Sequence, residues 1–298
     1  MSAVRDLDAR SDQVAGPRPA TVGSGASPTS VRTRPALSLI LPCYNEAERL
    51  PRTLATFLAE LPPRPGEVEV LVVDDGSTDE TFAVASAIAA KDARVRVIRT
   101  QPNRGKGFGV RTGVLAAQGE LVVFTDADGS YGPRDVERVL AALTDVPVAI
   151  GSRDAGAATG PFARRLASRQ FNHAIQALLR LPFRDTQCGL KGFQRQAALE
   201  VFSRARLDGF AFDAEVLVLA RRLGLQVTEV DVRAEERDGS KVQLAIDALR
   251  MLGDVVTVAR WAATGAYDLP DHALPEMPPD SVVTAPGLPA TGAGRLST

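Results

Sequence analysis

The fold of this chain is decided by the stretch LVVFTDAD at residues 121–128. Its four leading apolar residues suit a buried β-strand, and two carboxylates, Asp126 and Asp128, follow the strand one residue apart. In open α/β sheets, ligands bind at the carboxyl ends of the strands. Carboxylate oxygens are the ligands that Mg²⁺ and Mn²⁺ prefer. The stretch therefore predicts a metal site with coordination positions left open for a diphosphate.

A second strand with an acidic end lies upstream, in the sequence LVVDDGS at residues 71–77. One acidic turn means little, because Asp and Gly are ordinary turn residues. Two such turns, each closing a strand rich in β-branched residues, indicate a nucleotide site. Asp74 and Asp75 are therefore expected to be ligand residues, while Ser77 or Thr78 is expected to cap the helix that follows.

Apolar patterns typical of strands and of helices alternate along the chain. Strands are predicted at residues 37–41, 68–73, 95–99, 121–125 and 146–150, and helices at 49–61, 77–90, 135–143 and 211–222 and from residue 105 onward. This alternation favours a single α/β domain with a Rossmann-like, mostly parallel sheet flanked by helices. Right-handed crossovers then bring the polar segments to one edge of the sheet, namely residues 44–46, 74–75, 103–106, 126–128 and 151–153.

The composition is that of a globular protein, with 45% hydrophobic and 24% charged residues. A formal net charge of −1 gives no reason to expect nucleic acid as a partner. The two cysteines, Cys43 and Cys188, are far apart, so neither a disulfide framework nor a zinc site is supported. A reducing, cytoplasmic compartment fits this usage best.

Three segments are expected: a disordered N-terminal segment at 1–35, the folded domain at 36–268, and a disordered, proline-rich tail at 269–298. No run reaches the roughly 18 apolar residues of a spanning helix, and no signal-peptide core is seen. Residues 242–263 are predicted to form an amphipathic helix at the end of the domain. This helix and the arginine-rich residues 162–180 are suited to a membrane interface. Simple packing of both on the sheet is the open alternative.

Several motifs, taken in order, resemble those of glycosyltransferase family 2, which has the GT-A fold. They are Pro42-Cys43-Tyr44-Asn45-Glu46, VVDDGSTDET from Val72, NRGKG from Asn103 and the Asp126-Ala127-Asp128 triplet. In the second half, the sequences DTQCGLK at 185–191, FAFDAE at 210–215 and GSK at 239–241 resemble dolichyl-phosphate β-glucosyltransferases. The mannose-transferring relatives fit less well at 185–191. The matches cover roughly residues 37–268.

The resemblance implies an inverting hexosyltransferase that moves a hexose, most simply glucose, from a UDP-sugar to a polyprenyl or dolichyl phosphate. It also implies Mg²⁺ or Mn²⁺ at Asp126 and Asp128, and peripheral attachment to the inner face of the cytoplasmic membrane. The binding residues it implies around the donor and the phosphates are Pro42, Tyr44, Glu46, Asp74, Asp75, Lys106, Asp126, Arg153 and Ser240.

The implied catalytic residues are Asp213, Arg237 and Lys241. A phosphate acceptor is already ionised at pH 7, so we expect Asp213 to orient the sugar or the metal and not to abstract a proton. Arg153, Arg237 and Lys241 are expected to cradle the acceptor phosphate. Ser130 is a weak ligand at a position where mannosyl relatives often have a further oxygen, so water, Asp213 or Glu215 would complete the metal shell.

Only one of Asp213 and Glu215 is expected to face the site, because residues two apart on a helix do not share a face. Two other enzyme readings keep the fold: GDP-mannose as the donor, or a soluble acceptor such as a phosphorylated small acid. A nucleotide-sugar binding module without catalysis is the non-enzyme alternative. The sequence leaves the identity of the hexose, the polyprenol length and the oligomeric state open.

Overall fold

The computed structural model describes residues 34–61, 67–153, 162–234, 244–268 and 282–284, with backbone only at 162–169, 244–249 and 282–284. The strands are β1 Leu37–Cys43, β2 Val68–Asp75, β3 Val95–Thr100, β4 Leu121–Phe124, β5 Val148–Arg153, β6 Lys191–Gln194, β7 Val227–Val232 and β8 Val282–Thr284. The helices are α1 Leu50–Glu60, α2 Thr81–Ala89, α3 Lys106–Ala116, α4 Pro133–Ala142, α5 Phe162–Leu179, α6 Arg195–Phe202, α7 Phe212–Arg222 and α8 Leu244–Thr264.

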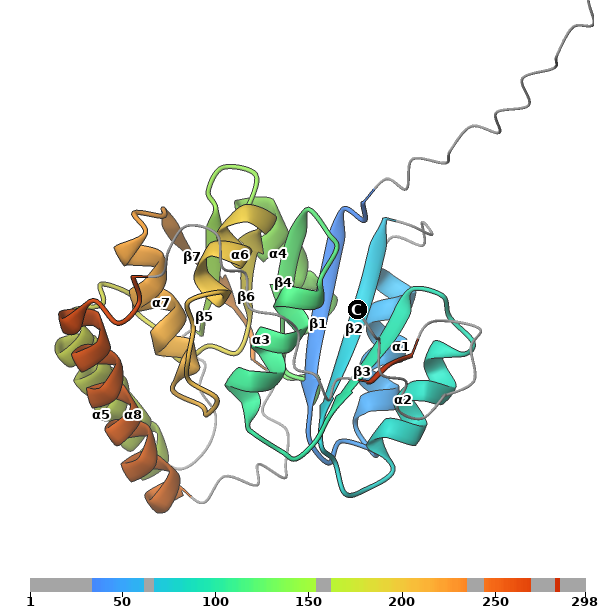
Figure 1. The fold of residues 1–298 in the computed structure, drawn as a ribbon, viewed down its shortest axis with the longest axis horizontal. Coiled ribbons are helices and arrows are strands. Elements are labelled where there is room, and N and C mark those ends of the chain that lie inside the picture. Colours follow the sequence, from blue (N-terminus) through green and yellow to red (C-terminus); the bar gives the residue numbers. More distant parts are fainter. Residues whose placement is uncertain (1–33, 62–66, 154–161, 235–243, 269–281, 285–298) are drawn as a thin grey trace, which may run out of the picture. The chain divides into compact units, whose positions relative to one another are not determined.

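The strands form one eight-stranded sheet in the order β7-β5-β6-β4-β1-β2-β3-β8 (Figure 1). Strands β1 to β5 and β7 run in one direction, while β6 and β8 are antiparallel to their neighbours. The predicted α/β class and mostly parallel sheet are therefore confirmed. The chain first builds outward from β1 to β3 and then returns to place β4 on the other side of β1. This reversal is the topological switch point, where ligands bind in open α/β sheets.

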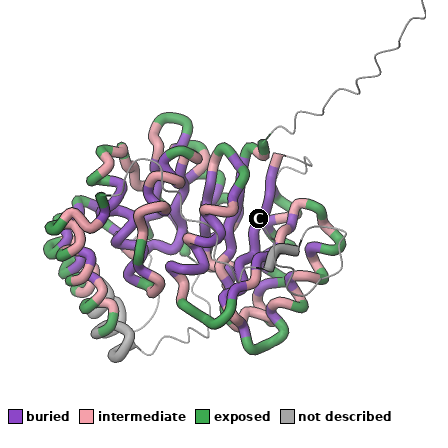
Figure 2. Tube along the Cα trace, in the orientation of Figure 1, coloured by how far each residue is buried: buried purple, intermediate pink, exposed green. Residues whose placement is uncertain are grey.

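Helices cover both faces of the sheet. One apolar cluster joins the β1 side chains Leu39 and Leu41 to α1, α2 and α4, and the other joins Ile40 to α3, α6 and α7. Because successive residues of a strand point to opposite faces, strands covered on both faces are apolar throughout. Figure 2 shows this as continuous burial along the central strands. Four aromatic rings tighten the second cluster, with centroid separations of 5.4–6.3 Å among Phe124, Phe193, Phe202 and Phe212.

Helices α5 and α8 lie side by side, and α8 also contacts α7 (Figure 1). Helix α8 matches the helix predicted at residues 242–263, and α5 covers the arginine-rich residues 162–180. Among the side chains that the structure describes on this pair, three large apolar ones are exposed, namely Leu178, Leu252 and Val256. None of the described helices has the length and apolar character needed to cross a bilayer.

Two details of the prediction are wrong. Helix α2 begins at Thr81, and neither Ser77 nor Thr78 caps it. Both residues instead bond to Asn45, whose backbone N–H donates to Ser77 Oγ at 2.9 Å and whose Oδ1 accepts from the Thr78 N–H at 2.8 Å. The proline-rich tail is not irregular throughout, because Val282–Thr284 forms β8 against the edge strand β3.

Candidate active site

The loops after β1 and β2 are tied to each other at the carboxyl edge of the sheet. Asn45 has a φ of 58°, a left-handed conformation that Asn tolerates. This turn lets its side chain reach the loop after β2, as described above. Glu46 makes a further hydrogen bond between the two segments, since its N–H donates to Thr81 Oγ1 at the start of α2, at 2.7 Å. The first predicted nucleotide segment is therefore held rigidly against the second.

The side chains predicted in the first segment differ in accessibility. Tyr44 is 45% exposed at the edge of the sheet, and Pro42 is half-buried beside α3. The Glu46 carboxylate accepts two hydrogen bonds from Arg49, from Nε and from Nη2, both at 2.6 Å. Tyr44 therefore offers an open aromatic face, while Glu46 is held by a planar two-point contact.

Asp74 and Asp75, at the end of β2, accept hydrogen bonds from the backbone of two loops, the one after β2 and the one before α3. Asp74 is 0% exposed, accepts the Ser77 N–H at 3.1 Å and lies 3.3 Å from the Arg99 guanidinium. The expectation that Asp74 contacts a ligand does not fit this burial. Asp75 accepts the backbone N–H groups of Arg104 and Gly105, at 3.0 and 2.6 Å. Burial raises the pKa of Asp75 although these hydrogen bonds oppose the shift.

Through Asp75, the end of β2 sets the start of α3. Gly105 precedes that helix with a φ of 120°, and a Cβ there would lie 2.6 Å from the Asp208 carbonyl oxygen. A Cβ on Gly107 would likewise lie 2.6 Å from the Leu207 carbonyl oxygen. Only glycine allows this approach. The glycines in the predicted NRGKG segment thus permit the close packing that places Lys106 in the site.

Lys106 lies among three carboxylates. Its Nζ is 2.6 Å from Asp126 Oδ1 and 4.0 Å from Asp213 Oδ2. Burial disfavours the ammonium form, but the nearby charges of Asp126, Asp213 and Asp128 outweigh it and raise the pKa of Lys106. One persistent cation at the start of α3 therefore links the acidic turn after β4 to Asp213 of α7.

Asp126 is also confined by the main chain. A Cβ on Gly189 would collide with the Asp126 carboxylate, so the chain passes directly against it at this point. Asp128 accepts the Ser130 N–H at 2.8 Å. The donor set of Asp126 and Asp128 consists of hard oxygens, which suits Mg²⁺ or Mn²⁺.

Within the part of the chain that the structure describes, no group of three or more His, Cys, Asp or Glu side chains is arranged to hold a metal. Two protein ligands are nonetheless enough for Mg²⁺, which usually keeps waters and substrate phosphates in its other positions. The residues therefore fit a divalent ion that is bound together with a diphosphate.

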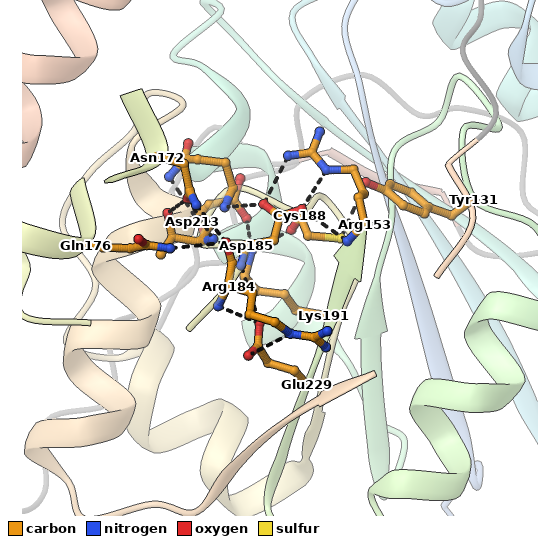
Figure 3. Close-up of polar contacts among 12 residues, drawn as sticks. Tyr131, Arg153, Asn172, Gln176, Arg184, Asp185, Cys188, Lys191, Asp213 and Glu229 are labelled. Atoms are coloured by element: carbon orange, nitrogen blue, oxygen red, sulfur yellow. Dashed lines mark hydrogen bonds and ion pairs between the residues drawn. The ribbon is translucent and has the colours of Figure 1, made fainter. Parts of the chain in front are cut away.

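Asp213 and Glu215 diverge from α7, as expected. Asp213 Oδ1 accepts from the buried Lys191 ammonium at 2.5 Å (Figure 3). The other oxygen of Asp213 is the one near Lys106. Glu215 points elsewhere and accepts the N–H groups of Arg206 and Leu207, both at 2.9 Å. Glu215 is thus committed to a loop, and the suggestion that it completes a metal shell is wrong.

Arg153, at the end of β5, is bound by a carboxylate that the sequence did not single out. Its Nε and Nη2 donate to Asp185 at 2.6 and 3.0 Å (Figure 3). Burial opposes ionisation of Asp185, but the Arg153 guanidinium holds the pKa of this carboxyl below its ordinary value. The remaining predicted residues, Arg237, Ser240 and Lys241, lie outside the described residues.

Two residues with evident structural importance, Lys191 and Asp185, were missed as individuals. Both belong to the DTQCGLK segment at 185–191, whose polar ends flank an apolar stretch. A lysine directly after the apolar residues Cys188, Gly189 and Leu190 is the available signal for Lys191, because a buried charge must find a partner. No local pattern identifies Asp185, whose partner Arg153 is 32 residues away in the chain.

A Rossmann-like sheet with paired carboxylates after β4, at its switch point, defines the GT-A class of glycosyltransferases. The family model for Glycosyl transferase family 2 matches residues 38–202, more than half of the chain. The chain belongs to this family. The resemblance seen in its motifs is thereby confirmed.

Several curated relatives are similar over most of the chain. A dolichyl-phosphate beta-glucosyltransferase of Drosophila melanogaster is 38% identical over 249 residues, which is 78% of this chain and 76% of that protein. The protein of the same name from Homo sapiens is 35% identical over 251 residues, or 78% of each chain. The Saccharomyces cerevisiae protein is 34% identical over 254 residues, or 78% of this chain and 76% of that one.

Solved structures share the fold. Glucosyl-3-phosphoglycerate synthase from Mycobacterium tuberculosis, in complex with phosphoglyceric acid, superposes with a TM-score of 0.59 at 21% identity. The similarity covers 76% of this chain and 80% of that chain. The same enzyme in complex with Mn²⁺, UDP-glucose and phosphoglyceric acid gives a TM-score of 0.57 at 22% identity, with the same coverage. At this level of identity the comparison establishes the GT-A fold.

Proposed function

We propose that this protein transfers glucose, with inversion, from UDP-glucose to a dolichyl-type polyprenyl phosphate. The observation that carries the proposal is the 34–38% identity, over 78% of the chain, to proteins named dolichyl-phosphate beta-glucosyltransferase. The arrangement of Asp126, Lys106 and Asp213 at the switch point supports it, because a nucleotide-sugar diphosphate needs both cations and metal ligands. GDP-mannose as donor and a soluble acceptor are the alternatives that the experiment below separates.

On the donor side, Asp126 and Asp128 would hold Mg²⁺ or Mn²⁺. When bound, the metal supplies Lewis-acid neutralisation of the charge on the leaving diphosphate. Lys106, already 2.6 Å from Asp126, would bind the same diphosphate as a fixed positive charge. Tyr44 would offer its exposed ring to the base, with Pro42 and Glu46 beside it. Asp75 would act by holding the Arg104–Gly105 turn in place.

On the acceptor side, Arg153, Arg237 and Lys241 would bind the lipid phosphate, and Ser240 would join them around the phosphates. This phosphate needs no general base, because it is ionised at neutral pH. The reaction therefore depends on bringing two anions together, with the attacking oxygen about 3 Å from the anomeric carbon. Asp213, fixed by Lys191 and near Lys106, would orient the sugar.

The acceptor also implies a location. Because its polyprenyl chain lies in a bilayer, we propose peripheral attachment to the inner face of the cytoplasmic membrane. The exposed apolar side chains Leu178, Leu252 and Val256 on α5 and α8 support a lipid-facing surface there.

The test is transfer of radiolabel into a lipid-extractable product. Purified protein is incubated with polyprenyl phosphate and Mg²⁺ or Mn²⁺, and separately with labelled UDP-glucose or GDP-mannose. We expect labelled lipid from UDP-glucose only, and none in EDTA. Asp128→Ala should lower the rate by about 100-fold or more, the scale of removing one electrostatic group from a transition-state site.

Asp145→Ala is the matched control, because this exposed carboxylate precedes β5 and so lies at the opposite edge of the sheet. Its rate should equal that of the wild type. Labelled lipid formed from GDP-mannose would contradict glucose as the transferred sugar but would agree with the proposed type of reaction. If labelled product forms with phosphoglyceric acid and with no lipid phosphate, the acceptor is a soluble phosphorylated acid and not a lipid.

A further inference from the structure

We propose that Asp185 is a positioning residue that fixes the Arg153 guanidinium for the phosphate group of the acceptor. The proposal rests on the proposed function, which places the acceptor phosphate at Arg153. It adds a residue whose own side chain does not need to touch the substrate. The argument starts from the way in which Asp185 holds Arg153.

The contact between the two side chains is a planar two-point contact. Arg153 Nε lies 2.6 Å from Asp185 Oδ2, and Arg153 Nη2 lies 3.0 Å from Asp185 Oδ1. The backbone N–H of Arg153 donates to the same carboxylate at 3.2 Å. This fork geometry fixes both the position and the plane of a guanidinium.

The two partners differ in exposure. The Arg153 side chain is 43% exposed, whereas that of Asp185 is only 11% exposed. Asp185 therefore holds the guanidinium by its inner edge. Nη1 is not engaged by Asp185, so the outer edge of the guanidinium can bind a phosphate oxygen while the inner edge stays fixed.

Asp185 is itself held by surrounding elements. The Gln187 N–H donates to Asp185 Oδ1 at 3.1 Å, and the Asp185 N–H donates to Glu229 of β7 at 3.3 Å. The next residue, Thr186, donates to Asn172 Oδ1 of α5 through both its N–H, at 3.1 Å, and its hydroxyl, at 2.7 Å (Figure 3). The segment that carries the carboxylate is thus anchored to α5 and β7 before any substrate binds.

This anchoring has an energetic consequence. A long arginine side chain loses rotamer freedom when it binds a ligand, and a side chain ordered in advance avoids that loss. Asp185 would hold the Arg153 side chain in one conformation, but its negative charge would also offset part of the positive charge that attracts the phosphate. The opposite hypothesis is that Asp185 competes with the phosphate and weakens its binding. The two hypotheses predict opposite changes when Asp185 is neutralised.

The test compares steady-state kinetics of the wild type and Asp185→Asn, with each substrate varied in turn. We expect the KM for polyprenyl phosphate to rise about three- to tenfold, the scale of ordering one long side chain. The KM for UDP-glucose should stay within about twofold, because Arg153 is assigned to the acceptor. A lower KM for the acceptor, or equal increases in both constants, would overturn the proposal.

A double-mutant cycle shows whether Asp185 acts through Arg153. In an Arg153→Ala background, Asp185→Asn should raise the acceptor KM no further, because the side chain to be positioned is gone. Full additivity would contradict the proposed role. Arg34→Gln is the control, since it removes an ion pair with Glu120 that is exposed on both sides and leaves Asp185, its anchors and Arg153 unchanged.

Asn172→Ala keeps the proposal testable if Asp185→Asn does not fold. This variant loosens the anchor of Thr186 without altering Asp185 or Arg153, and should raise the acceptor KM in the same direction by a smaller factor. Calorimetric binding of a short-chain prenyl phosphate gives the same comparison without turnover. A wild type that binds this phosphate but transfers no glucose would count against the proposed function alone, whereas unchanged binding in Asp185→Asn would count against this inference.

Discussion

Lys191 is a charged side chain with 0% exposure, and it lies in the middle of the sheet. Its ammonium donates to Asp213 Oδ1 and to the Cys188 carbonyl oxygen, each at 2.5 Å. Burying a charge is costly unless the charge is paired and hydrogen-bonded. Here one buried ion pair orients an acidic residue at the edge of the candidate site.

Replacing Lys191 by Met should lower the free energy of unfolding by about 3–5 kcal/mol, because Asp213 would keep a buried charge without its nearest partner. Urea denaturation measures this loss. In the double variant Lys191→Met/Asp213→Asn, part of the stability should return. Arg34→Met is the control, since its pair with Glu120 is exposed on both sides and should contribute no more than about 1 kcal/mol. A loss of stability in Lys191→Met no larger than that in Arg34→Met would contradict the argument.

Helix α7 connects several elements through one carboxylate. Glu215 accepts the N–H groups of the loop before α7 and also the hydroxyl of Tyr267, which follows α8, at 2.9 Å. Burial raises the pKa of Glu215, although all three hydrogen bonds act in the opposite direction. The same loop packs against Gly105 and Gly107 at the start of α3. The seating of α8 and the placement of Lys106 therefore share one loop.

Tyr267→Phe should destabilise the protein by about 1–3 kcal/mol, because a buried carboxylate loses one of its donors. The thermal unfolding midpoint, followed by circular dichroism, measures this change. Tyr44→Phe is the matched control: Tyr44 is 45% exposed and should change the midpoint little. An unchanged midpoint in Tyr267→Phe would show that this contact adds nothing to the seating of α8.

At the scale of the whole molecule, the net charge of −1 gives no general attraction to anionic lipid. Any attachment must therefore be local, and α5 and α8 offer the exposed apolar side chains for it. The sequence of α5 also contains Arg164, Arg165 and Arg169. Basic residues beside an apolar surface bind the headgroup region in a salt-dependent manner.

We predict that the protein floats with vesicles containing anionic lipid at low salt and is released at high salt. The double variant Leu252→Gln/Val256→Gln should weaken flotation at least severalfold, since two exposed apolar side chains are lost from the contact. Val84→Gln, on the half-buried surface of α2, is the control. Recovery of the wild type in the soluble fraction alone at low salt would contradict the membrane proposal.

The amino-acid sequence by itself determined the α/β class and the edge of the sheet that carries the site. Apolar runs ending in Asp74-Asp75 and in Asp126-Ala127-Asp128 predict strands and acidic turns from local chemistry alone. Strands β2 and β4 of the structure agree with this prediction. Strands β6 and β8 were not predicted. One is antiparallel and contains a lysine, and the other is a three-residue strand within a proline-rich segment. The alternation VTEVDV of β7 was a usable signal that was missed.

Only the tertiary structure decided which polar side chains face the site. Asp74, Glu215 and Asp213 are alike as sequence features, yet the first is fully buried at the end of β2, the second binds a loop, and the third lies near Lys106. The structure also pairs Arg153 with Asp185, and Lys191 with Asp213. The physical reason is that hydrophobic periodicity reports burial along one element, whereas ion pairs depend on distances between elements that local sequence does not encode.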